Sequence, residues 1–179
     1  MILQPPTGLT SLHAAQLQKW IPPGGSTNPS EWNEVYCGTK HGFGAATFHA
    51  RCDGRARLLV LVRSQEGGWL FGGYTAVGFA LPTGYHADPA AYIFSLTNSL
   101  GHPEKLESRH TRMDIYYGRF SSASFGDGAG LGICNNADTI AGSSTITGVA
   151  YAASASTTHP MAQGQVDGWL AAEVIAWVV

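Results

Sequence analysis

Charged residues are scarce in this chain. Only 12% of its 179 residues are charged, and ten Lys and Arg against twelve Asp and Glu give a formal net charge of -2. Soluble domains average about 25% charged residues, so Gly, Ser, Thr, Asn and Ala must supply much of the surface and the turns. The chain also lacks the excess of positive charge that grips a phosphate backbone. We therefore expect no nucleic acid partner.

Long apolar runs are missing as well. No run approaches the ~18 residues that cross a bilayer, and the residues after Met1 form neither the basic segment nor the apolar core of a secretory signal. We expect a soluble, cytoplasmic or otherwise intracellular protein that does not insert directly into a membrane. The length favours one compact domain.

Cysteines are few and do not form pairs in the sequence. Cys37, Cys52 and Cys134 are an odd set without C-x-x-C spacing, and the only Asn that could start a glycosylation acceptor, Asn28, is followed by Pro29. Both features favour a reducing compartment. Most such thiols are small buried side chains, and any of the three that is exposed is a candidate for redox chemistry.

The common catalytic signatures are absent too. The chain has no G-x-x-x-x-G-K-[ST], G-x-S-x-G or H-E-x-x-H motif, and Gly42-x-Gly44 is better read as a tight turn than as a dinucleotide fingerprint. Seven scattered histidines show no metal-ligand spacing. We predict no catalytic residue, metal or cofactor. A nucleophile made of Cys37 or Cys52 with a nearby histidine, His41 or His49, stays open because such partners converge in space.

Glycine is abundant, with 23 residues, and it separates segments rich in β-branched and aromatic side chains. This pattern predicts a mainly β fold. The clearest unit is a hairpin, in which Arg57–Arg63 forms a strand covered on both faces, 65–68 the turn, and Trp69–Thr75 the return strand. Further strands are expected at 92–97, 104–106, 114–117, 132–134 and 169–179.

Two helices and two loops complete this interpretation. Helical spacing predicts a helix over Leu9–Ile21, capped by Thr10 or Ser11, and a second over Ala45–Arg51. The glycine-rich stretch Ser121–Gly132 is expected to form a loop or bulges, and Ala150–Gln165 an exposed, mobile loop. We divide the chain into an N-terminal helical arm and loop, residues 1–31, and a β domain, residues 32–179.

Glu173 is the most informative charge because it lies inside the apolar closing strand. A period of two places it on one face with Trp169, Ala171, Ile175 and Trp177. If that face is the core, the carboxylate must accept hydrogen bonds, and the amides of the glycine loop at 126–132 are candidate donors. If the strand is an edge, an exposed carboxylate would deter pairing. Both alternatives stay open.

Several separated patches occur together in a typical order. The patches are His41-Gly42-Phe43 with Thr47-Phe48-His49 and Cys52-Asp53-Gly54, Phe71-Gly72-Gly73-Tyr74-Thr75, Asp88-Pro89 with Ala91-Tyr92-Ile93-Phe94-Ser95-Leu96, Tyr117-Gly118, Phe125-Gly126-x-Gly128, and Trp169–Val179. With these patches the chain resembles the TLDc domain family from about Trp32 to its end, although Gly44 stands where the family often has a capping hydroxyl.

The resemblance implies a β-sandwich of two antiparallel sheets flanked by a few short helices. It also implies a non-enzymatic interaction module that binds a protein assembly, plausibly subunits of a vacuolar-type proton ATPase, in connection with oxidative-stress resistance. Such a protein could lie peripheral to an organelle membrane through its partner. The resemblance assigns binding or structural roles to Phe71, Gly72, Gly73, Tyr74, Phe125, Gly126, Asp127, Gly128 and Glu173.

Two alternatives remain from the residues alone. One is a thiol-based stress protein that uses Cys37, Cys52 or Cys134. The other is a sandwich that binds a carbohydrate or another small ligand, which would require two of the five tryptophans to be exposed together.

Overall fold

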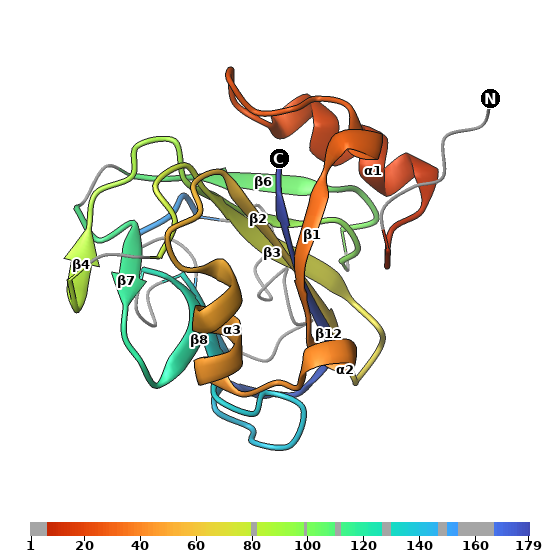
Figure 1. Cartoon of the computed structure of the whole chain (residues 1–179). Helices are drawn as coiled ribbons and strands as arrows, with labels where there is room; N and C mark the ends of the chain where they lie inside the picture. Colours follow the sequence, from red (N-terminus) through yellow and green to blue (C-terminus); the bar gives the residue numbers. More distant parts are fainter. Residues whose placement is uncertain are drawn as a thin grey trace.

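A computed structural model describes residues 7–79, 82–98, 100–109, 112–126, 130–146, 150–153 and 167–179. The strands form antiparallel sheets in the orders β1-β12-β2-β3-β5-β6, β11-β10-β9-β8 and β4-β7 (Figure 1). The elements are α1 (Ser11–Trp20), the 3-10 turn η1 (Pro29–Glu31), β1 (Asn33–Cys37), α2 (Gly38–His41), α3 (Ala45–Cys52), β2 (Leu58–Ser64), β3 (Leu70–Thr75), β4 (Gly84–His86), β5 (Tyr92–Ser95), β6 (Glu104–Glu107), β7 (Ile115–Tyr117), β8 (Ser121–Phe125), β9 (Leu131–Cys134), β10 (Ser143–Thr145), β11 (Asp167–Trp169) and β12 (Ala171–Val178). The predicted mainly β class, with antiparallel sheets and short helices, is confirmed.

Strand β2 lies inside the six-stranded sheet and is covered on both faces. Val60 and Val62 belong to an inner core that also contains side chains of the four-stranded sheet. Leu59 and Leu61 belong to a second core on the outer face. This double coverage explains the continuous apolar run of the strand. The predicted hairpin with β3 is present.

The outer face of the six-stranded sheet is covered by α1 (Figure 1). Its Leu17 is fully buried, and Thr10 caps the helix by accepting a hydrogen bond from the backbone N–H of His13. The predicted helix is therefore present, and of the two predicted cap residues, Thr10 and Ser11, Thr10 is the N-cap. No helix among the described residues is long and apolar enough to cross a membrane.

Close packing around β3 explains why Gly72 and Gly73 have no side chain. A Cβ on Gly73 would lie 2.7 Å from the ring of Phe125, which comes from the opposite sheet. A Cβ on Gly72 would lie 1.9 Å from the carbonyl oxygen of Val60. Gly73 and Phe125, about fifty residues apart in the sequence, thus meet in the inner core, and a side chain at Gly73 would force the layers apart. A side chain at Gly72 would instead disturb the pairing of β3 with β2.

Helix α3 begins at Gly44, which has no side chain to cap it. The side-chain oxygen Oδ1 of Asn135 instead accepts a hydrogen bond of 2.7 Å from the N–H of Ala45. A residue from the turn after β9 thus replaces the capping hydroxyl. Ala45, Phe48 and Cys52 are buried on one face of the helix, as its spacing predicts.

Two predicted loops are wrong in part. Ser121–Phe125 form β8 and Leu131–Gly132 belong to β9, so this stretch is largely paired strand. The register of the pair shifts between Ser121 and Ser124, as a bulge would cause, and Gly126 just after β8 has a φ of 81°. Small Ser and Ala side chains in β8 pack between layers and carry little β propensity. In the segment Ala150–Gln165, Ala150 and Tyr151 are buried, and Tyr151 donates a hydrogen bond to the carbonyl of Asp114. Residues 154–166 lie outside the described residues.

The closing segment is not one strand. Residues up to Trp169 pair with β10 in the four-stranded sheet, and after Leu170 the chain enters the six-stranded sheet as β12. There β12 pairs with β1 and β2 on its two sides (Figure 1). The register with β2 shifts between Ala171 and Glu173, which is the mark of a β-bulge. The strand β12 therefore lies inside the six-stranded sheet, and the closing segment joins the two sheets.

Candidate functional site

The carboxylate of Glu173 is buried, with 9% of the residue exposed. Its Oε1 accepts hydrogen bonds from the N–H groups of Thr39, at 3.1 Å, and Val174, at 2.9 Å. Its Oε2 accepts from the hydroxyl of Thr39 and, at 3.5 Å, from the thiol of Cys37. Such donors stabilise a buried charge without a cation.

These donors lie mainly where β1 ends and α2 begins. Helix α2 has no side-chain cap from its own N-cap residue, Cys37. Glu173 reaches the second residue of this helix, Thr39, from a strand that is 134 residues away in the sequence. A carboxylate at a helix start satisfies free N–H groups. Glu173 thus fixes β12 to the β1–α2 junction.

The structure decides between the two alternatives for Glu173: the carboxylate is buried and accepts hydrogen bonds, as the first alternative requires. It is not on an exposed edge, because β12 pairs with β2 on one side of Glu173 and the β1–α2 junction covers the other side. The donors named above come from the β1–α2 junction and from Val174, not from the glycine loop at 126–132. The shared face is also wrong in part: Trp169 and Ala171 point into the inner core, whereas Ile175 lies in the outer one. The bulge at Ala171 and Glu173 shifts the alternation by one residue.

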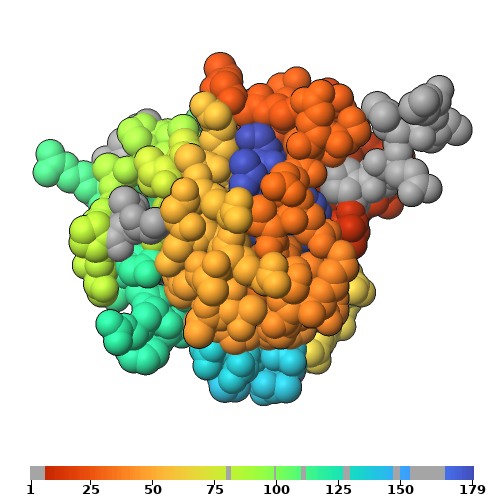
Figure 2. Space-filling model, viewed as in Figure 1, coloured from red at the N-terminus to blue at the C-terminus, as the bar shows by residue number. Residues whose placement is uncertain are grey.

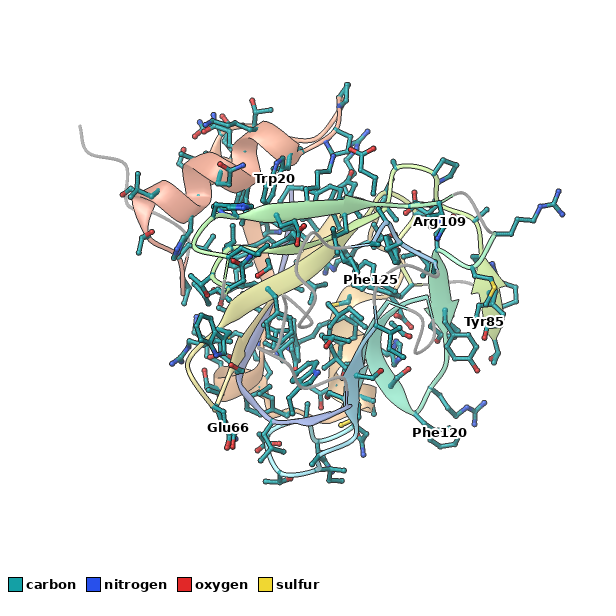
Figure 3. All side chains as sticks on the ribbon, turned by 180° about the vertical axis from the view of Figure 1, so that it is seen from behind. Trp20, Glu66, Tyr85, Arg109, Phe120 and Phe125 are labelled. Atoms are coloured by element: carbon teal, nitrogen blue, oxygen red, sulfur yellow. The ribbon has the colours of Figure 1, made fainter. Side chains whose placement is uncertain are left out.

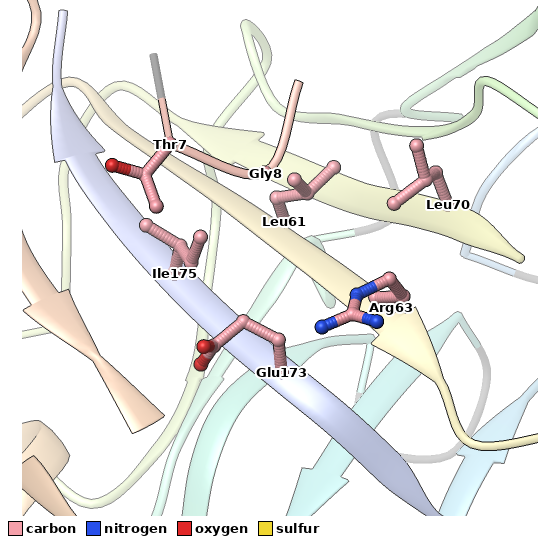
Figure 4. A pocket seen from close by; sticks show the side chains of 7 residues that line it. All are labelled: Thr7, Gly8, Leu61, Arg63, Leu70, Glu173 and Ile175. Atoms are coloured by element: carbon pink, nitrogen blue, oxygen red, sulfur yellow. The ribbon is translucent and has the colours of Figure 1, made fainter. Parts of the chain in front are cut away.

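A cavity of about 180 Å³ lies beside Glu173, between the chain before α1 and the outer face of the six-stranded sheet. Figure 4 shows its apolar side chains below Thr7 and Gly8, and two charged side chains on neighbouring strands. The cavity is lined by Thr7, Gly8, Leu61, Arg63, Leu70, Glu173 and Ile175.

The cysteines differ in access. Cys37 and Cys52 are buried and Cys134 is half-buried. Burial raises the pKa of the Cys52 thiol to about 12, so this residue is a poor nucleophile in the folded protein. The Sγ of Cys134 lies 3.1 Å from the carbonyl oxygen of Ile140.

The two histidines near these cysteines in the sequence, His41 and His49, form hydrogen bonds with groups other than a cysteine thiol. The Nδ1 of His41 accepts a hydrogen bond of 3.0 Å from the backbone N–H of Cys37. The Nδ1 of His49 lies 2.8 Å from the carboxylate of Asp53, and its Nε2 lies 2.9 Å from the carbonyl oxygen of Ser121. His49 therefore ties α3 to the start of β8. The cysteine and histidine pairing left open from the sequence receives no support.

The motif residues predicted around β3 and β8 are mostly core. Phe71, Tyr74 and Phe125 are buried; Phe71 meets the ring of Trp169 edge to face at 5.0 Å, and Tyr74 stacks on Tyr92 at 5.2 Å. These residues hold the layers together and offer no surface to a partner. Asp127 and Gly128 lie outside the described residues.

The expected strand at 114–117 is present as β7, but its partner β4 was not expected from the sequence. The small β4–β7 sheet lies at one margin of the molecule next to α3 (Figure 2). Tyr85 of β4 is 45% exposed and Phe120, which follows β7, is 83% exposed. Figure 3 shows both along the same margin. The ring of Tyr85 packs against Tyr116 with 5.2 Å between centroids. We call the surface of Tyr85, Tyr116, Arg119 and Phe120 the β4–β7 edge.

Comparison with known protein families adds one finding. The sequence model of the TLDc domain matches residues 3–168. This range contains α1, the β4–β7 edge, the strands β1 to β10 and the first two residues of β11, and it ends before β12 and Glu173. Within the described ranges, no three His, Cys, Asp or Glu side chains gather as they would to hold a metal ion.

Proposed function

Because the chain belongs to the TLDc domain family, we propose that it is a non-enzymatic interaction module that docks on a large protein assembly. The single observation that carries this proposal is the β4–β7 edge. Exposed large apolar side chains along one margin of a domain are typical of protein interfaces, where aromatic residues and Arg are enriched. Phe71, Tyr74 and Phe125, which the resemblance also names, are buried and would serve as scaffold rather than as contact surface.

The charges around the edge indicate the chemistry of the partner. Arg119 in the turn after β7 and Arg112 before β7 are exposed, and so are Arg51 and Arg55 at the end of α3. The carboxylate of Asp53, just after α3, is engaged by His49 and by the hydroxyl of Tyr117. A cationic rim around aromatic anchors suits an acidic patch on the partner.

Local contacts hold the edge in place. His49 bonds to the backbone of the β7–β8 turn at the carbonyl oxygens of Gly118 and Ser121, and the hydroxyl of Tyr117 donates to Asp53 over 3.0 Å. A surface that is fixed before binding loses less entropy on association than a mobile one. This arrangement supports docking of the edge as a rigid body.

The family resemblance makes the peripheral part of a vacuolar-type proton ATPase the first assembly to test. Docking there would place the protein peripheral to an organelle membrane through its partner. The test measures binding of the purified chain to the purified peripheral part, under reducing conditions, for the wild type and for Tyr85→Ser/Phe120→Ser. We expect the double variant to bind at least about tenfold more weakly, because hot-spot aromatics contribute about 2 kcal/mol or more each.

Leu12→Ser is the matched control, because Leu12 is also 83% exposed but lies on α1. It should bind as the wild type does. A wild-type chain that does not bind the ATPase part removes this partner. A double variant that binds as tightly as the wild type removes the edge as the docking surface, whatever the partner.

The thiol alternative rests on Cys134, the one cysteine that is not fully buried among the three. If the link to oxidative-stress resistance works through a thiol, Cys134→Ser should abolish protection of cells against peroxide, and Cys52→Ser should not. Equal protection by Cys134→Ser and the wild type would contradict a thiol mechanism. The carbohydrate alternative receives no support, since none of the five tryptophans is exposed.

A further inference from the structure

The cavity beside Glu173 has the size and the floor of a small-ligand site. Leu61, Leu70 and Ile175 supply apolar side chains that are at most 7% exposed. The volume is about 180 Å³, and an apolar cavity of about 150 Å³ is known to accept benzene. A six-membered ring or a short aliphatic chain therefore fits.

The N-terminal arm closes the cavity on the side away from the sheet. Gly8 has a φ of 80°, and a Cβ there would lie 3.1 Å from the Cδ1 of Ile175 and 3.7 Å from the Cδ2 of Leu61. A side chain at this position would enter the space above the apolar floor. Glycine thus keeps the cavity open while the arm stays close to the sheet.

The side chain of Arg63 lines this cavity and can still donate hydrogen bonds to a ligand. It is exposed and lies opposite Glu173 in the strand register. The backbone of Arg63 is part of the sheet, but its side chain makes no hydrogen bond or ion pair with the described residues. A guanidinium presents a planar fork of donors that matches a carboxylate in two parallel hydrogen bonds.

The carboxylate of Glu173 does not occupy the guanidinium of Arg63, because it is hydrogen-bonded elsewhere. Its two oxygens accept from Thr39, Val174 and Cys37. Figure 4 shows that the carboxylate turns away from Arg63, whose guanidinium turns toward β12. Among the residues that the structure describes, the cavity therefore offers one cation with a free side chain above an apolar floor, and its other charge is hydrogen-bonded.

We propose that this cavity binds the anion of a small monocarboxylic acid with an aromatic or short aliphatic body. The carboxylate pairs with Arg63, and the body lies on Leu61 and Ile175 under Gly8. The inference does not rest on the docking function, because the cavity and the β4–β7 edge share no residue.

The test titrates the ¹⁵N-labelled chain with three probes of one size, which are benzoate, benzamide and benzylammonium. Benzoate should shift the amide signals of Gly8, Leu61 and Ile175 and bind most tightly, and benzylammonium should leave these signals unmoved. Arg63→Gln should weaken benzoate binding about tenfold or more, because a charge-assisted pair is lost. The affinity for benzamide should stay the same.

Arg119→Gln is the control for a general loss of positive charge, since Arg119 is exposed on the β4–β7 edge. It should bind benzoate as the wild type does. The proposal is overturned if benzoate leaves the three signals unmoved, if benzylammonium shifts them equally, or if Arg119→Gln weakens benzoate as much as Arg63→Gln. Because Arg63 is exposed, its variant should fold normally, which the dispersion of the same spectra shows.

Discussion

Replacing Glu173 tests whether its carboxylate holds β12 to the start of α2. In Glu173→Gln the amide oxygen can keep the bonds from the backbone N–H groups of Thr39 and Val174. The hydroxyl of Thr39 can rotate to accept from the new NH₂ group. Only the charge assistance is lost, so we expect a destabilisation of about 2 kcal/mol. In Glu173→Leu both backbone donors stay buried without an acceptor, and we expect about 4 kcal/mol.

The assay is urea unfolding followed by tryptophan fluorescence, with the slope of the transition checked for constancy. Glu66→Gln is the control, because Glu66 is exposed at the β2–β3 turn (Figure 3), and it should unfold within about 0.5 kcal/mol of the wild type. The reasoning is refuted if Glu173→Leu is as stable as the wild type. It is also refuted if the Gln and Leu variants are equally destabilised, since capping predicts a difference between them.

Three further predictions address the core, the thiols and the N-terminal arm. Phe71→Ala and Trp177→Ala should each cost about 3–5 kcal/mol in urea unfolding, because both side chains are buried; near-native stability would contradict their place in the cores. Iodoacetamide labelling read by mass spectrometry should modify Cys134 well before Cys52, whose pKa is raised to about 12 by burial, and equal rates would contradict this order. Burial lowers the pKa of His13 in the folded protein from its ordinary 6.5. The stability that the neutral imidazole contributes is therefore fully present above pH 6.5 and is lost as the pH falls through the lower pKa of the folded protein. Thermal melting should show this loss of stability in the wild type and less of it in His13→Gln.

The long apolar segments could be predicted from the sequence because local pattern and burial agree in them. β2 is apolar on both faces, and α1 and α3 show helical spacing with a clear stop. The three-residue strands β4, β10 and β11 could not be found this way. They are polar or glycine-rich, so their pairing depends on neighbours that are distant in the sequence.

Of the site around Glu173, the sequence indicated only Glu173 itself and not the residues that donate hydrogen bonds to it. A carboxylate in an apolar strand signals either a buried acceptor or an edge, and the pattern does not show where the donors are. Thr39 is 134 residues away and Asn135, which caps α3, is 90 residues from its partner. The exposure of Tyr85 and Phe120 could not be predicted from the sequence either, because it depends on which residues pack around each side chain.

The bulge in β12 decides on which face Glu173 lies, and it can be tested by deletion. Ala171 points inward opposite Ser64, Glu173 points outward opposite Arg63, and half-buried Ala172 is the extra residue between them. Without a bulge, strict alternation would place Glu173 in the inner core, where burying a charge without donors is costly.

Deleting Ala172 removes the extra residue and leaves every other side chain of β12 on its present face. We expect this variant to fold with a loss of about 1–2 kcal/mol from the changed twist. Deleting Ala176, in the regular part of the strand, moves the buried Trp177 to the opposite face and should remove most of the about 5–15 kcal/mol of a typical domain. Urea unfolding of the two deletion variants decides the matter. If the Ala172 deletion unfolds the chain while the Ala176 deletion is tolerated, the bulge is not what sets the face of Glu173.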